Sequence, residues 1–260
     1  QYRPRDPEDI LNEVEECLKT GLYRSVYFDD DTFNIGRERI LAIAQGFIDR
    51  KFGIPWGIMA RADLMDRELL LKLKESGLYS LKYGVESSSQ EILDRCGKKL
   101  DLKKVREVCL ITRAAGIKYH LTFTFGLPGE TWETAMDTIR FALEMDPDSL
   151  QFSIVTPFPG SKFFDEMEKA GKLVTHDWKK YDGHNKAVIR TDSLSPEQLE
   201  EIRCLAESLW DKHVQKRKVS GNVFSYFLKA LFHPVWTMEK IRVAIAYFRL
   251  KARLGKKAPE

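Results

Sequence analysis

The sequence has few cysteines, and none of them lies close to another. The four are Cys17, Cys96, Cys109 and Cys204, a spacing that argues against a zinc or iron–sulfur ligand set built from one loop. Cys17, Cys109 and Cys204 fall on or beside the apolar stripe of an expected helix, so we expect them to be buried. The five histidines form no HxxxH or HxH pair, and no P-loop, GxGxxG fingerprint or GxSxG elbow occurs.

Long apolar runs are also missing. None approaches the roughly 18 residues that a membrane span needs, and the N-terminal stretch QYRPRDPEDI has no apolar signal core. We therefore expect a cytoplasmic protein. With 260 residues, 43% of them hydrophobic and 31% charged, the chain can form one large domain plus an appendage.

Charge is distributed unevenly along the chain. Residues 203–260 carry 13 Lys/Arg and 4 Asp/Glu, a balance of +9, so the net charge of +3 leaves −6 for residues 1–202. Aromatic residues interleave with the basic ones over 220–260, which suits either a helical cap on the main domain or peripheral contact with an anionic inner membrane face. We favour the cap, and we expect no nucleic-acid partner.

Five short apolar runs begin near residues 25, 54, 79, 118 and 149, with a helical pattern between each pair. Helices are expected to begin at Asp6, which caps the first of them, and at Asp66, Asp101 and Thr131. A further helix is expected to begin at Ser195, where Ser195 and Gln198 form a capping box. This βαβα order predicts a parallel sheet, either open and doubly wound or part of a barrel. The chemistry of the loops favours the barrel, and in both architectures ligands bind at the carboxyl ends of the strands.

Four loop motifs follow these runs: FDDDTF at 28–33, YGVESSSQEIL at 83–93, FGLPGET at 125–131 and TPFPGS at 156–161. Gly126 lets the backbone approach a flat ligand, or else it forms a tight turn capped by Thr131. Glu86 and Ser87 suit a ribose hydroxyl or an ammonium group. The alternative for the serines is a helix cap at Ser88 or Ser89.

Charged residues at the other strand ends leave alternatives open. Asp29, Asp30 and Asp31 need a cation, a ligand amine or water between them, and since no further acid or histidine lies in register we predict no metal site. Arg61 pairs with one of these acids, with a ligand carboxylate, or in a structural salt bridge. His120 lies within a strand and faces either a barrel lumen or the core, of which we favour the core.

The order and spacing of these motifs over residues 1 to about 170, with DWKKYDG at 177–183 and LSPEQL at 194–199 beyond them, resemble the radical S-adenosylmethionine (SAM) enzymes of the cobalamin-binding class. The resemblance implies an α/β fold, a partial (β/α)6 TIM-barrel-like barrel lacking its first strand, with a C-terminal helical extension. The implied domains are the partial barrel with strands 2 to 6 at 1–171, an irregular segment and helix packing on the barrel at 172–215, and a basic aromatic helical tail at 216–260.

The resemblance also implies a chemistry. In the family a [4Fe–4S] cluster on a CxxxCxxC loop reductively cleaves SAM to a 5′-deoxyadenosyl radical, which attacks an organic substrate for oxidation, cyclisation or methylation. The implied cofactors are SAM, the cluster and, through an upstream domain, cobalamin. A tetrapyrrole, a hopanoid-type lipid or a natural product is the implied substrate, and a flavodoxin or ferredoxin is the implied reductant. No catalytic residue is assigned.

The resemblance assigns a SAM-binding role to ten positions at strand ends. They are Asp29 and Asp30 near the methionine amino group, Arg61 at the third-strand position, Glu86 and Ser87 near methionine and ribose, Phe125, Gly126 and Leu127 along the adenine, and Thr156 and Pro157 beside adenine or substrate.

The CxxxCxxC loop itself is absent from the sequence. We therefore expect the C-terminal portion of a longer enzyme, inactive by itself and with an exposed sheet edge that promotes aggregation. The alternative is a non-catalytic barrel that acts as a binding or scaffold module.

Overall fold

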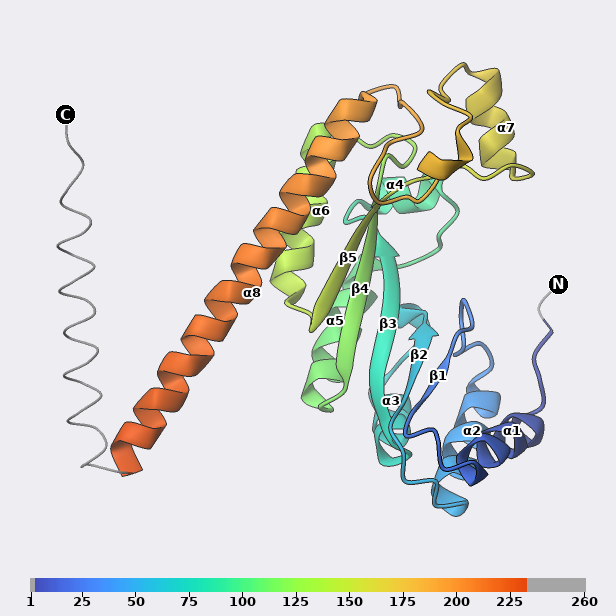
Figure 1. Cartoon of the computed structure of the whole chain (residues 1–260), viewed down its shortest axis with the longest axis vertical. Coiled ribbons are helices and arrows are strands. Elements are labelled where there is room, and N and C mark those ends of the chain that lie inside the picture. The colour runs from blue at the N-terminus through green and yellow to red at the C-terminus, as the bar shows by residue number, and fades with distance from the viewer. Residues whose placement is uncertain (1–2, 233–260) are drawn as a thin grey trace. The chain divides into compact units, whose positions relative to one another are not determined.

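The structure, a computed structural model, describes residues 3–232, which build a parallel sheet with helices between its strands (Figure 1). The elements in chain order are α1 (Pro7–Lys19), β1 (Val26–Phe28), α2 (Arg37–Asp49), β2 (Trp56–Ala60), the 3-10 helix η1 (Ala62–Leu64), α3 (Arg67–Glu75), β3 (Leu78–Glu86), α4 (Gln90–Arg95), α5 (Leu102–Ala114), β4 (Lys118–Phe125), α6 (Trp132–Met145), β5 (Ser149–Ile154), α7 (Lys162–Lys169), the 3-10 helix η2 (Trp178–Lys180) and α8 (Pro196–Phe232).

The five strands lie in the order β1-β2-β3-β4-β5, and each pair is parallel. The five expected strands and the helices between them are thus confirmed. Asp6, Asp66, Asp101 and Thr131 each cap a helix by accepting a hydrogen bond from a backbone N–H of its first turn. These caps satisfy donors that a helix start otherwise leaves unpaired, and all four lie where the sequence predicted a helix to begin.

The two faces of the sheet differ in chemistry. One face is apolar and buried against helices: the Tyr83 hydroxyl meets Thr112 of α5, and Phe123 packs edge-on against Phe141 of α6. The opposite face, called the inner face below, is only partly buried and largely polar. It carries Tyr27, Gly57, Met59, Ser80, Lys82, Gly84, Glu86, His120, Thr122, Thr124, Ser149, Gln151 and Ser153.

This alternation distinguishes the sheet from that of a doubly wound protein. Parallel strands covered on both faces read as nearly continuous apolar runs. Here, from Leu81 in β3 and from Tyr119 in β4, every second residue is buried and the residues between are partly exposed. The pattern is that of an open barrel with a polar lumen, in agreement with the predicted partial-barrel fold.

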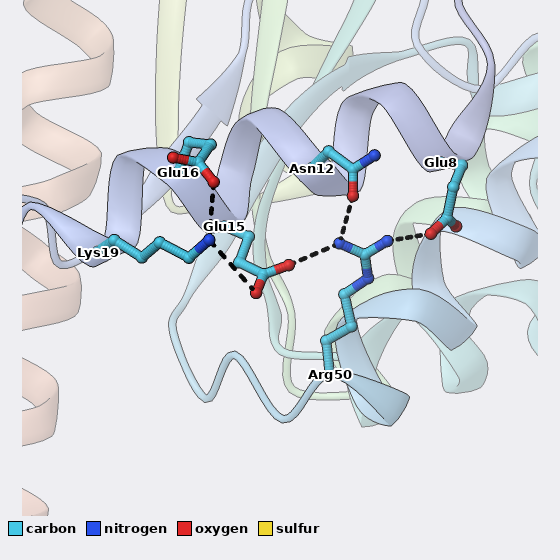
Figure 2. Close-up of polar contacts among 6 residues, drawn as sticks. All are labelled: Glu8, Asn12, Glu15, Glu16, Lys19 and Arg50. Carbon is cyan, nitrogen blue, oxygen red and sulfur yellow. Dashed lines mark hydrogen bonds and ion pairs between the residues drawn. The ribbon is translucent and has the colours of Figure 1, made fainter.

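Helices α1 and α2 are fixed to each other by one arginine at the end of α2 (Figure 2). Arg50 donates to Asn12 and Glu15 of α1, each at 2.8 Å, and also pairs with Glu8. Lys19 extends the network through Glu15. The Arg50 side chain is 21% exposed, and three of its five donors form hydrogen bonds with α1.

The stretch between α7 and α8 has little regular structure but follows the edge of the sheet. Ile154 at the end of β5 donates its N–H to the carbonyl oxygen of Gly183 at 2.7 Å. Helix α8 then begins with the predicted reciprocal cap, in which the Ser195 N–H donates to Gln198 Oε1 and the Gln198 N–H donates to Ser195 Oγ. The start of α8 lies beside the carboxyl edge of the sheet, where Leu199 approaches Gly126 at the end of β4.

The chain divides into two compact units, residues 1–208 and 209–260. Helix α8 continues to Phe232, and no helix among the described residues is both long enough and apolar enough to cross a membrane. Most of the basic aromatic tail predicted at 216–260 lies outside the described residues. The domain boundary at 215/216 and the membrane contact of 220–260 stay predictions.

The cysteine prediction is correct for one residue and wrong for two. Cys109 is buried, whereas Cys17 and Cys204 are exposed. Burial on α1 ends with Val14, one turn before Cys17, and Cys204 points away from the buried Ile202 and Ala206 of α8. Both helices bury a narrower stripe than the sequence pattern indicates.

Candidate functional site

Glu86 ends β3 in an unusual backbone conformation. The register with β4 shifts between Gly84 and Glu86, and the φ of Glu86 is 71°, in the left-handed region. A left-handed non-glycine residue costs about 1–2 kcal/mol, and a bulge re-aims the side chain that follows it. The result is that the carboxylate lies over Gly84 on the inner face, where a Cβ added to Gly84 would stand 2.7 Å from Glu86 Oε1.

Two donors hold this carboxylate. Lys98, in the loop after α4, donates to Glu86 Oε1 at 2.5 Å, and Thr124 of β4 donates its hydroxyl proton to Oε2 at 2.8 Å. The Glu86 side chain is still 26% exposed. Since each carboxylate oxygen accepts about two hydrogen bonds, Glu86 keeps capacity for a hydroxyl or ammonium of a ligand. Lys98 is a residue of this site that the sequence reasoning did not name.

The FGLPGET loop is organised from within by Glu130, which the sequence reasoning also missed. Glu130 is 1% exposed, and its Oε2 accepts the Gly126 N–H at 2.5 Å. Burial raises the pKa of Glu130 to about 7. Its Oε1 has no partner among the described residues. The only signal in the sequence is an acid placed one residue before the capping Thr131.

Gly126 takes a φ of 89° and packs tightly. A Cβ at this position would lie 3.1 Å from Val155 Cγ1 and 3.3 Å from Leu199 Cδ2. The glycine therefore lets the start of α8 close over the loop, and Thr131 caps α6 as expected for a tight strand-to-helix turn.

The remaining predicted residues lie at or just beyond the ends of β4 and β5, and most of their side chains are buried. The Phe125 ring is fully buried and stacks on Phe152 at a centroid distance of 5.6 Å. Leu127 and Pro157 are also buried. Thr156 is partly exposed, and its hydroxyl donates to the Ile154 carbonyl oxygen at 3.2 Å.

Ser87 is fully buried and serves the turn that follows Glu86. Its Oγ accepts the Ser89 N–H at 3.1 Å, and Ser89 in turn caps α4. Ser88 is tied to Thr138 of α6. The serine run therefore fixes the backbone that carries the Glu86 carboxylate.

Arg61 is committed to a neighbour in its own loop. Its guanidinium donates two hydrogen bonds to Asp63, at 3.0 and 2.8 Å, and one to the Lys99 carbonyl oxygen at 2.8 Å. The hydrogen bond to Asp63 raises the pKa of Arg61, with burial opposing it. Asn34 brackets the Arg61 backbone through both its N–H and its carbonyl. Of the three alternatives that the sequence left open for Arg61, the structure shows the structural salt bridge.

Asp29 and Asp30 are exposed and line a hollow of about 410 Å³ between β1, α1 and the segment before α1. Arg5 and Arg39 line the same hollow. Within the described part of the chain, no hydrogen bond or ion pair joins either acid to Glu86. The structure thus brings Glu86 together with Thr124 and Lys98, but it places the aspartates in a separate depression.

The His120 side chain lies on the inner face of the sheet. Our preferred interpretation, that it lies in the core, is therefore wrong. The alternation of β4 sets it beside Lys82 of β3, its partner in the strand register. Its Nδ1 lies 2.8 Å from Ser149 Oγ, and its Nε2 is enclosed without a partner in the described chain. Burial, with a smaller effect of Lys82, lowers the pKa of His120 to about 4, so the ring is neutral at pH 7.

The described residues do not fit an iron–sulfur cluster. No three of their His, Cys, Asp or Glu side chains gather as a metal site. Cys109 is buried, and burial raises its pKa to about 12, far from the thiolate that a cluster needs.

A family model for the radical SAM superfamily matches residues 1–142. An uncharacterized methyltransferase of Pyrococcus horikoshii is 25% identical over 241 residues, which cover 87% of this chain and 52% of that protein. The anaerobic magnesium-protoporphyrin IX monomethyl ester cyclase of Rubrivivax gelatinosus is 29% identical over 182 residues, which cover 69% of this chain and 32% of the cyclase. The chain thus spans about half or less of the length of these relatives.

A solved structure agrees with the fold. The radical SAM methyltransferase TsrM from Kitasatospora setae, with cobalamin and a [4Fe-4S] cluster bound, superposes with a TM-score of 0.58 at 18% identity. The match covers 65% of this chain and 32% of that one. At this level of identity the likeness concerns the fold, the partial barrel with a parallel sheet.

Proposed function

Because the chain belongs to the radical SAM superfamily, we propose that its inner face binds SAM in an enzyme that methylates or cyclises an organic substrate. The observation that carries the proposal is the Glu86 carboxylate, turned onto a polar face at the carboxyl edge of a parallel sheet. Ligands of α/β sheets collect at that edge.

Glu86 is the residue that would contact the cofactor. A carboxylate accepts hydrogen bonds from ribose hydroxyls or from the ammonium of methionine, and Thr124 and Lys98 fix its position without burying it. The loop that begins at Gly126 supplies backbone groups at the next strand end, and Glu130 holds that loop in shape. These residues bind and orient SAM.

The reaction class and the other components are part of the same proposal. Methyl transfer and cyclisation are proposed because one of the two relatives is named a methyltransferase and the other a cyclase. Cobalamin, bound in the TsrM structure, is proposed for the whole protein, together with a reductant of the flavodoxin or ferredoxin type. The radical chemistry requires a cluster whose ligands are not among the described residues, and those residues act by binding SAM and excluding water from it.

Calorimetric titration with S-adenosylhomocysteine tests the proposal directly. We expect Glu86→Gln to weaken binding about tenfold, since a charge-assisted hydrogen bond contributes about 1.5–3 kcal/mol. Glu91→Gln is the matched control, because Glu91 lies on the exposed side of α4 and pairs with Arg95. Equal binding by both variants would remove Glu86 from the site.

Activity is tested on the complete open reading frame, reconstituted anaerobically with iron and sulfide. Release of 5′-deoxyadenosine from SAM under dithionite, lost in Glu86→Gln and kept in Glu91→Gln, is the expected result. A loaded cluster with no release would favour the non-catalytic scaffold instead.

A further inference from the structure

The inner face carries one positive charge that no acid among the described residues neutralises. Its ionisable side chains are Tyr27, Lys82, Glu86 and His120. Glu86 is paired with Lys98, and His120 is neutral at pH 7. Tyr27 stays a neutral phenol, since burial raises its pKa. Lys82 is left as the unbalanced charge of the face.

Lys82 has no carboxylate partner among the described residues. Its contact is with Gln151 of β5, whose Oε1 lies 3.5 Å from Lys82 Nζ, at the limit of a hydrogen bond. Of its neighbours in the register, Met59 on β2 is apolar and His120 on β4 is neutral. A partly buried ammonium is normally paired, because removing it from water is costly.

A second unsatisfied group lies on the next strand. In the tautomer in which His120 Nδ1 accepts the Ser149 hydroxyl proton, Nε2 carries the ring proton and is a donor without an acceptor. His120 and Lys82 are direct partners in the register, so their side chains start about 5 Å apart on the same face. A cation and an unused donor thus lie on neighbouring strands of one face, and the described residues place no acid beside them.

We propose that Lys82, with His120 beside it, binds an anionic group of the substrate, a carboxylate or a phosphate. This inference rests on the proposed function, because it places the substrate on the same inner face as SAM. Lys82 precedes Glu86 by four residues along β3, roughly 13 Å at the rise of a strand. The substrate class is therefore an elongated organic acid or phosphate ester, whose anionic group lies far along β3 from the carbon that reacts.

The test uses NMR of the iron-free complete protein, with histidine labelled at Cε1. Sodium acetate and inorganic phosphate are titrated separately against sodium chloride at equal ionic strength, and the His120 signal, assigned with a His120→Gln variant, is followed. We expect one of the two anions to shift this signal saturably. In Lys82→Met the dissociation constant should rise about tenfold or more, the effect of losing one charge-assisted hydrogen bond.

Lys103→Met is the matched control, since Lys103 is exposed on α5 and its removal changes the net charge equally. Stronger binding of acetate indicates a carboxylic acid substrate, and stronger binding of phosphate indicates a phosphate ester. A shift that is absent, matched by chloride, or unchanged in Lys82→Met would overturn the inference. S-adenosylhomocysteine binding, measured on the same variants, reports separately on the proposed function and should not change in Lys82→Met.

Discussion

The Lys98 ammonium lies 2.5 Å from the carboxylate of Glu86, and both side chains are about one quarter exposed. The acid of the inner face is therefore held in place before any ligand arrives. Its second oxygen is held by Thr124 from the neighbouring strand. Such positioning lowers the ordering cost of binding, so the residues around Glu86 should affect affinity even where they do not touch the ligand.

Thr124→Val tests that positioning. The substitution removes the hydroxyl that donates to Glu86 Oε2 and keeps the shape of the side chain. We expect S-adenosylhomocysteine affinity to fall about threefold to tenfold and the unfolding free energy to fall by about 1 kcal/mol. Thr122→Val, two residues earlier on the same face, is the control. If both variants weaken binding equally, the effect belongs to the strand and not to the hydrogen bond.

Gly84→Ala should separate binding from folding. The new methyl group would lie 2.7 Å from Glu86 Oε1 and 3.0 Å from Lys98 Nζ, both at the ends of flexible side chains. The pair must move, so we expect weaker S-adenosylhomocysteine binding in calorimetry and a melting temperature within a few degrees of that of the parent protein. A large loss of melting temperature with unchanged affinity would contradict the placement of the carboxylate over Gly84.

The sequence predicted the framework of the fold because local signals carry it. Caps such as Asp66 and Thr131 and the apolar strands are read from neighbouring residues alone. The inner face was readable too, in the alternation of His120, Thr122 and Thr124 with buried residues, but a parallel sheet is expected to be apolar on both faces.

The site was less predictable because its contacts are not local. Lys98 reaches Glu86 from twelve residues away, and only the bulge and left-handed φ of Glu86 bring the two together. The sequence suggested Arg61 as a ligand-binding residue, but in the structure Arg61 forms an ion pair with Asp63, two positions further along the chain. Ser87 and Phe125 match the family motif in sequence, yet their side chains are buried.

Arg50→Ala should loosen the N-terminal helix pair. Arg50 bridges α2 to three side chains of α1 and is mostly buried, so its loss removes a network and not a single surface pair (Figure 2). We expect the unfolding free energy in urea to fall by about 1–2 kcal/mol. Arg67→Ala is the matched control, since Arg67 is exposed at the first turn of α3, and it should change stability by less than about 0.5 kcal/mol.

The buried carboxyl of Glu130 should make stability depend on pH. Burial raises the pKa of Glu130 from 4.5 to about 7, so between these values the folded protein binds more protons than the unfolded chain. Stability therefore falls as pH rises through this window, by an amount on the order of 3 kcal/mol for Glu130. The acid is favoured in its neutral form, which a glutamine resembles in size and charge.

Glu130→Gln should remove this contribution. In urea unfolding at a series of pH values from 5 to 8, the variant should approach or exceed the stability of the parent protein as pH rises, because it has no buried charge to form. The difference between the two proteins isolates Glu130 from the other groups that titrate in this range. Glu133→Gln, an exposed acid in the first turn of α6, should keep the pH dependence of the parent. A difference curve that is flat with pH would mean that Glu130 ionises normally, and that the Gly126 N–H is held by a carboxylate with access to water.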